Sequence, residues 1–210
     1  MDNRYPELHL VTSGRQERDS LLRIAEAAYA GGITYLHIRE KQRTAREIME
    51  WAVALAEIMP RDRIFINDRV DVAAATSCGG AHLAYHSIPA AAARTVLKPG
   101  QKIGCSVHSM AEAQAALSQK VDYLFYGHIF ASGSKPGVAP RGTEELSEIT
   151  CSLDIPVIGI GGIKPDNVGR VLAAGCAGVA VLSGITEAPD SKRAAQAYRE
   201  ALDRWREENT

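Results

Sequence analysis

The segment PVIGIGGIKPDNVGRVLAAGCAGVAVL, residues 156–182, contains one complete strand–helix–strand unit. Apolar runs at 156–160 and 178–182 flank a stretch at 165–174 that starts with proline and is followed by Gly175. Proline is favoured in the first turn of a helix, and glycine is favoured just after its last turn. We therefore predict two strands at the apolar runs and a helix between them.

The same alternation of short apolar runs and longer amphipathic stretches fills the chain. Strands are predicted at 8–12, 34–39, 64–67, 81–83, 102–106, 123–127, 156–160 and 178–182. Helices are predicted at 20–30, 44–58, 109–117 and 165–174, from Ser191 onward, and around the alanine run 90–93. Eight β-then-α units without a compositional break predict a single (β/α)8 TIM barrel domain spanning 1–210, with a parallel eight-stranded sheet. A doubly wound open sheet is the alternative, but no GxGxxG turn follows the first strand.

Composition excludes several classes of function. The formal net charge is −1, and no basic stripe or helix-turn-helix is evident, so we expect no binding to nucleic acid. No apolar run is long enough to span a bilayer, and the N-terminus lacks the apolar core of a signal peptide, so we expect a cytoplasmic protein without membrane contact. The four cysteines are scattered without a CxxC pair, which predicts free thiols rather than disulfides or a zinc site.

Polar residues follow several of the predicted strands, where the substrate-binding face of such a barrel lies. Arg39, Asn67 and Ser106 are the last residues of the second, third and fifth predicted strands, and we predict that they bind substrate there. His128 follows the sixth strand, and its imidazole could take up and return a proton near neutral pH. A purely structural role is the alternative for His128, and loop stabilisation is the role expected for His82 and, similarly, for His108.

Two further groups of residues predict a phosphate site. Glycines after the seventh and eighth strands let backbone N–H groups approach phosphate oxygens, and a hydroxyl-rich loop ending in lysine can bind an anion. The residues are Gly161, Gly162, Ser183 and Gly184, together with Ser132, Ser134 and Lys135 in the loop. A tight turn and a flexible polar loop are the respective alternatives.

Short motifs in this order resemble the thiamin phosphate synthase/TenI superfamily over essentially the whole chain. The matching segments include HIREK at 37–41, INDR at 66–69, AHL at 81–83, GCSVH at 104–108 and IGGI at 160–163. The synthase branch joins an aminopyrimidine pyrophosphate to a thiazole phosphate using magnesium. For that branch the resemblance implies that Arg39, Lys41 and Lys135 bind pyrophosphate, and that Asp68 and a second aspartate bind the metal.

Three departures resemble the TenI branch instead. Ser87 stands nearest to the place of the second aspartate, His37 replaces the usual glutamine, and His128 replaces the usual proline after Gly127. The TenI resemblance implies an isomerase, a thiazole tautomerase that makes a carboxythiazole phosphate aromatic, with His128 as its acid and base. Arg39 would balance the substrate carboxylate, and no metal or other cofactor would be needed.

Two other functions remain open at this point. One is a magnesium-dependent thiamin phosphate synthase with an altered metal site, which Asp68, Arg39, Lys41 and Lys135 favour. The other is a non-catalytic regulatory or ligand-binding homologue. The expected partner is a small-molecule thiazole phosphate, and the apolar stripe on the last helix permits a homodimer.

Overall fold

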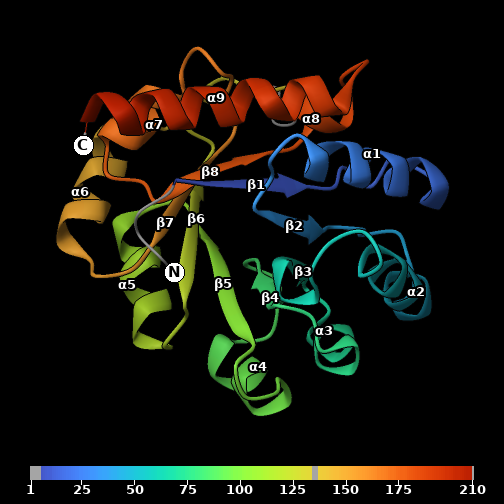
Figure 1. Cartoon of the computed structure of the whole chain (residues 1–210). Coiled ribbons are helices and arrows are strands. Elements are labelled where there is room, and N and C mark those ends of the chain that lie inside the picture. Colours follow the sequence, from blue (N-terminus) through green and yellow to red (C-terminus); the bar gives the residue numbers. More distant parts are fainter. Residues whose placement is uncertain (1–5, 134–136, 210) are drawn as a thin grey trace.

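A computed structural model describes residues 6–133 and 137–209, and its eight strands close into one parallel barrel (Figure 1). The strands are β1 (Glu7–Val11), β2 (Tyr35–Ile38), β3 (Ile64–Asn67), β4 (Gly80–Leu83), β5 (Lys102–Val107), β6 (Tyr123–Gly127), β7 (Val157–Ile160) and β8 (Gly178–Val181). Each strand pairs with its neighbour in sequence, and β8 pairs with β1 to complete the circle. The predicted (β/α)8 barrel is confirmed.

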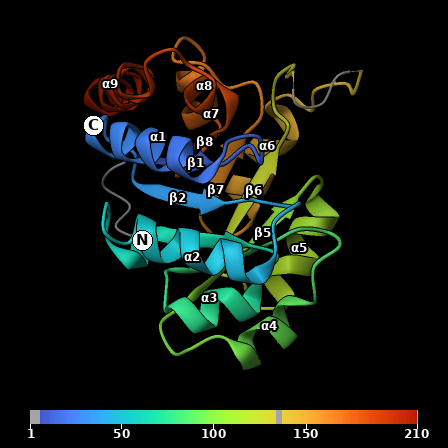
Figure 2. The same ribbon diagram turned by 90° about the vertical axis from the view of Figure 1, so that its right-hand side faces the viewer.

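Helices cover the outside of the barrel. They are α1 (Arg18–Ala30), α2 (Ala45–Leu55), α3 (Val70–Thr76), α4 (Ala90–Val96), α5 (Met110–Ser118), α6 (Glu144–Ser152), α7 (Val168–Ala173), α8 (Ser183–Thr186) and α9 (Ser191–Asn209), with a 3-10 turn η1 (Arg61–Arg63) before β3. Figure 2 shows α2, α3 and α4 along one side of the barrel and α7, α8 and α9 along the opposite side. The α2 helix begins with the predicted capping box, because the Thr44 hydroxyl accepts from Glu47 N and the Glu47 carboxylate accepts from Thr44 N.

Rings fill the inside of the barrel. His9, His37 and His82 are at most 1% exposed, and they pack with Tyr123 and Phe125 at ring-centroid distances between 4.3 and 6.3 Å. The space for one of these rings depends on a residue without a side chain: a Cβ added at Gly104 would lie 2.0 Å from the Tyr123 ring. The lumen is therefore a packed core, and a substrate has to bind at the rim.

Hydrogen bonds link two buried histidines and a glutamate. His9 Nε2 donates to Glu7 Oε2 at 2.9 Å, and His9 Nδ1 lies 2.9 Å from His37 Nε2, where one of the two nitrogens donates to the other. His37 Nδ1 is buried and has no partner among the described residues. Burial holds the pKa of His37 well below its ordinary value and lowers the pKa of His82 to about 3, so both rings are neutral.

Several boundaries differ from those predicted. The α7 helix begins at Val168 rather than at 165, because the Asn167 carboxamide oxygen accepts from Lys164 N and the intervening residues form a turn. The α2 helix ends at Leu55 rather than at 58. His82, which was expected to stabilise a loop, lies inside the barrel on β4. Three helices were not predicted at all: α3, α6 and the four-residue α8.

The prediction of free thiols over disulfides is confirmed, since all four cysteines are free, with two buried, one half-buried and one exposed. Within the two described parts of the chain, no helix has both the length and the apolar character needed to cross a bilayer.

The buried histidines predict a fold that weakens in mild acid. The pKa values of His37 and His82 are lower in the folded barrel than in the unfolded chain. Below pH 6.5 the unfolded chain therefore binds protons at these two residues that the folded chain does not bind, and the free energy of unfolding falls as the pH falls. Each histidine contributes a slope of about 1.4 kcal/mol per pH unit. Urea unfolding between pH 7.5 and 5 measures this slope, and H82Q should reduce it by about half. A free energy of unfolding that stays constant over this range would contradict the account.

Candidate functional site at the barrel rim

A polar pocket of about 320 Å³ opens at the carboxyl ends of β2 and β3, beside the loop that follows β4. It is lined by Glu40, Lys41, Arg43, Ile48, Asn67, Asp68, Arg69 and His86. Seven of these eight side chains are polar or charged, which fits a charged ligand better than an apolar one. Loops that follow parallel strands in a barrel are the usual place for substrate.

The three cations of the pocket differ in their partners. Arg43 donates to Glu17 at 2.9 Å and to Glu47 at 3.3 Å, and its guanidinium lies over the Trp51 ring. Arg69 makes a two-pronged ion pair with Asp71. Lys41 is exposed and has no ion pair with any residue that the structure describes, so its ammonium group is available to an anion.

Glu40 forms the floor of the pocket. It is 5% exposed, and its Oε1 accepts from the Thr12 hydroxyl at 2.6 Å. The same hydroxyl accepts from Arg39 N at 2.8 Å, so Thr12 ties β1 to the end of β2. Burial raises the pKa of Glu40, and the Thr12 hydrogen bond partly offsets this effect. Glu40 Oε2 is buried without a partner among the described residues, and it borders the pocket.

Asp68 is held in a fixed orientation at the edge of the pocket. Its backbone has a left-handed φ of 63°, and its N–H donates to the His82 carbonyl at 2.9 Å. The Ser87 hydroxyl donates to Asp68 Oδ1 at 2.6 Å. The neighbouring Asn67 has a buried Oδ1 without a partner in the described chain. The pocket thus presents an oriented carboxylate and unsatisfied oxygen acceptors, which suit a cation or a hydrogen-bond donor.

His128 lies away from this pocket. It is 4% exposed, its Nε2 donates to the Val138 carbonyl at 3.2 Å, and it follows β6 rather than β2 or β3. Gly161 packs against it so closely that a Cβ there would lie 2.2 Å from His128 Cβ. The His128 ring is therefore in contact with the loop that follows β6, and it is not among the residues that line the polar pocket.

The other glycines predicted to bind phosphate also have packing roles. A Cβ on Gly162 would lie 2.4 Å from the Ala131 carbonyl oxygen, and one on Gly184 would lie 2.4 Å from Tyr198 Oη. Ser183, at the start of α8, is exposed. These contacts explain the glycines without a ligand, so phosphate binding by Gly161, Gly162, Ser183 and Gly184 stays a prediction.

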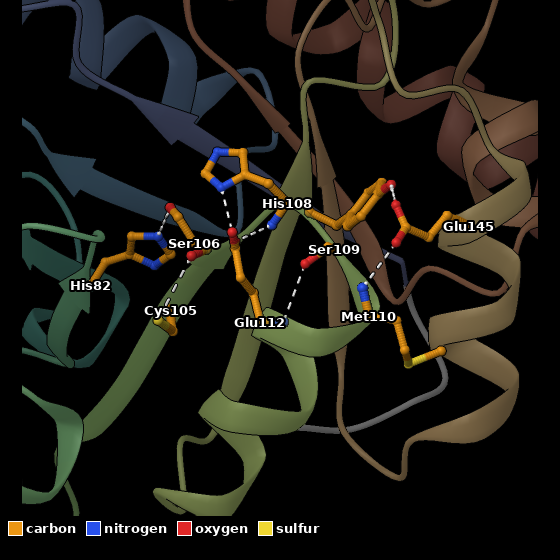
Figure 3. Close-up of polar contacts among 9 residues, drawn as sticks. His82, Cys105, Ser106, His108, Ser109, Met110, Glu112 and Glu145 are labelled. Atoms are coloured by element: carbon orange, nitrogen blue, oxygen red, sulfur yellow. Dashed lines mark hydrogen bonds and ion pairs between the residues drawn. The ribbon is translucent and has the colours of Figure 1, made fainter.

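The remaining predicted residues are spread around the rim. Asn67 borders the pocket, whereas Arg39 is half-buried outside its lining. Ser106 Oγ lies 2.8 Å from His82 Nε2, so it is bonded to the ring cluster inside the barrel. Figure 3 draws this contact as a dashed line. Ser132 is half-buried in the loop after β6. Ser134 and Lys135 lie outside the described residues.

His108 stabilises its loop as expected, because its ring and its N–H both contact the Glu112 carboxylate (Figure 3).

Several pocket residues were not predicted as site residues. Glu40 and Arg69 belong to the HIREK and INDR motifs, so the motifs themselves were the available signal. His86 lies in the loop after β4, which carries no recognised motif, and Arg43 directly precedes the helix predicted at 44–58.

Comparison with known proteins supports a synthase relationship. The family described as thiamine monophosphate synthase matches residues 8–185. A thiamine-phosphate synthase of Moorella thermoacetica is 41% identical over 189 residues, covering 88% of this chain and 90% of that protein. One from Chlorobium luteolum is 38% identical over 204 residues, covering 96% and 95%. A solved thiamine phosphate pyrophosphorylase from Pyrococcus furiosus superposes with a TM-score of 0.84 at 32% identity, covering 97% of this chain and 98% of that one.

These matches overturn the expected isomerase. The relatives are named as synthases, which are transferases, and none of the three is named as a thiazole tautomerase. His128 was predicted to transfer a proton in a tautomerase reaction, and the comparisons do not support that reaction for this chain. The synthase alternative, which Asp68 and Lys41 favoured, agrees better with the comparisons.

The Thr12–Glu40 contact predicts a stability cost at the pocket floor. The T12V substitution keeps the side-chain shape but leaves Glu40 Oε1 and the Arg39 N–H without their partner, so it should lower the free energy of unfolding by about 1–3 kcal/mol. T95V is the control, because the Thr95 hydroxyl bonds an exposed helix carbonyl, and its effect should stay within about 0.5 kcal/mol. Equal urea midpoints for both variants would show that the buried hydrogen bond contributes nothing.

Proposed function

The chain belongs to the thiamine monophosphate synthase family, and we propose that it catalyses the synthase reaction for which its relatives are named. In that reaction an aminopyrimidine pyrophosphate joins a thiazole phosphate to give thiamin phosphate and pyrophosphate. The carbon–oxygen bond to pyrophosphate breaks, pyrophosphate leaves with the electron pair, and the carbon forms a new bond to the thiazole nitrogen. Negative charge therefore builds up on the leaving pyrophosphate.

The observation that carries the proposal is the polar pocket after β2 and β3. Pyrophosphate needs cations that are free to approach it, and the exposed Lys41 ammonium meets that need. Arg69 borders the same pocket, and its guanidinium could exchange some contact with the exposed Asp71 for contact with the anion. Charge held in place before the bond breaks stabilises the leaving group without reorganisation.

The residues present fit a divalent cation that is shared with the substrate. Magnesium in proteins is commonly held by one or two carboxylates together with substrate phosphates and water. Asp68 supplies one oriented carboxylate beside the pocket, and the unpartnered Asn67 Oδ1 adds a neutral oxygen nearby. When bound, the cation would neutralise charge on the leaving pyrophosphate. Asp68 is the one carboxylate that we assign to the cation, because the other carboxylate of the pocket, Glu40, is 5% exposed and bonded to Thr12. The chain alone should therefore bind magnesium weakly and should need the pyrophosphate group to complete the site.

Other features of the proposal rest on the sequence alone. Gly161, Gly162, Ser183, Gly184 and the loop with Ser132, Ser134 and Lys135 would bind the phosphate of the thiazole. His37, Ser87 and His128 place the sequence nearer the TenI branch, so we propose a synthase that carries TenI-type residues at three positions. The single domain over 1–210 and the homodimer likewise remain proposals.

The test is thiamin phosphate formation from both substrates with magnesium. Wild type should form the product with release of one pyrophosphate per turnover. K41A and D68N should each lower kcat/KM by roughly 100-fold, because each removes a group that stabilises the leaving pyrophosphate. The control is K98A, since Lys98 bonds Ser77 outside the pocket, and its activity should stay within about twofold of wild type.

Two outcomes would overturn the proposal. The first is a folded wild-type protein that binds the pyrimidine pyrophosphate without forming product, which would favour a non-catalytic homologue. The second is turnover that is unchanged in K41A and D68N, which would place the reaction away from this pocket.

A further inference from the structure

His86 and Asp68 face each other across one edge of the polar pocket. His86 Nε2 lies 3.4 Å from Asp68 Oδ1, and both residues line the pocket. Asp68 follows β3 and His86 follows β4, so two adjacent strands bring the side chains together. The His86 side chain is 41% exposed and the Asp68 side chain is 23% exposed, so an ion could reach both from solvent.

The Ser87 hydroxyl already bonds the same Asp68 oxygen that His86 faces. It accepts from Ala84 N at 2.9 Å and donates to Asp68 Oδ1 at 2.6 Å. This arrangement makes Ser87 a positioning residue that orients the Asp68 carboxylate. It does not leave the hydroxyl free to replace the missing second carboxylate. His86 Nε2 has only its contact with Asp68 among the described residues, so it is the nearest available donor.

We propose that His86 Nε2 is the second protein ligand of the divalent cation, and that this site binds Mn²⁺ in preference to Mg²⁺. Neighbouring ligands of one ion, each about 2.1 Å from it, lie roughly 3.0–3.4 Å apart in octahedral or tetrahedral geometry. The 3.4 Å separation of Nε2 and Oδ1 matches that range. Mn²⁺ belongs to the first-row transition metals that mixed nitrogen and oxygen sites bind, whereas Mg²⁺ in proteins is held by carboxylate, phosphate and water oxygens.

The exposed Tyr85 supports this position for the imidazole. Its ring meets the His86 ring edge to face at a centroid distance of 5.1 Å. Tyr85 itself is 92% exposed, so it contributes no core packing, and the contact with His86 is the only ring contact that it makes in the described chain. An aromatic neighbour restricts the imidazole without competing for Nε2.

The inference rests on the proposed function only for the presence of a cation, and its test does not require turnover. Untagged full-length protein is mixed with Mn²⁺ and inorganic pyrophosphate and examined by electron spin-echo envelope modulation. Wild type should show ¹⁴N coupling to Mn²⁺, and H86A should lose it together with about a tenfold loss of Mn²⁺ affinity. Mg²⁺ competition should show weaker binding of Mg²⁺ than of Mn²⁺ in wild type.

Two further variants make the result specific. H108A removes a similar histidine–carboxylate pair, in which Nδ1 lies 3.2 Å from Glu112 outside the pocket, and it should keep the ¹⁴N coupling. H86D should restore cation binding with the preference shifted toward Mg²⁺, because it returns an oxygen ligand to the site. Restoration in H86D also excludes a folding defect as the cause of the loss in H86A.

The inference and the proposed function fail in different ways. Thiamin phosphate formation without ¹⁴N coupling in wild type would overturn the role of His86 and leave the synthase proposal intact. A ¹⁴N signal in a protein that forms no product would support His86 as a ligand and overturn the synthase proposal. Equal Mn²⁺ affinity in wild type and H86A would also overturn the inference.

Discussion

The packed lumen of the barrel is the constraint on which the rest of the structure depends. Imidazole and phenyl rings from β1, β2, β4 and β6 occupy the interior, and Gly104 leaves the space that the Tyr123 ring needs. Because burial keeps His37 and His82 neutral, these rings pack as a polar but uncharged core. A charged substrate has no room inside, so binding is confined to the loops at the rim.

Around that rim, the two sides of the barrel differ in how they use their residues. The arc after β2, β3 and β4 presents Lys41 as an available cation, Asp68 as an oriented carboxylate, and two buried oxygen atoms that have no partner among the described residues. The arc after β6, β7 and β8 uses its glycines for close packing, with Gly161 against His128 and Gly184 against Tyr198. This asymmetry favours the first arc as the place where a pyrophosphate and its cation would bind.

The sequence predicts the barrel well because each strand is a short apolar run bounded by polar or glycine residues. Two of the eight predicted strands, 64–67 and 123–127, match the structure residue for residue, and the others differ by one residue at one or both ends. Short helices such as α3 carry too few turns to show a periodic pattern, so they were missed. The helix start at 165 was wrong because side-chain bonding by Asn167 favours a turn there, which propensity alone does not reveal.

The candidate site was harder to predict from sequence, because strand-end position does not tell which way a side chain faces. His37 and His82 point into the lumen, and the glycines after β7 serve packing that involves residues far away in the sequence. Motif membership correctly directed attention to Asp68 and Asn67. It did not indicate that His86, in a loop without a recognised motif, lies 3.4 Å from that carboxylate.

The most direct test of the central claim is a crystal structure with Mn²⁺ and pyrophosphate, in which anomalous scattering locates the metal. The account predicts an anomalous peak beside the Asp68 carboxylate, with pyrophosphate oxygens against Lys41 in the pocket after β2 and β3. Pyrophosphate bound instead over the glycines after β7 and β8, with no metal at Asp68, would contradict it.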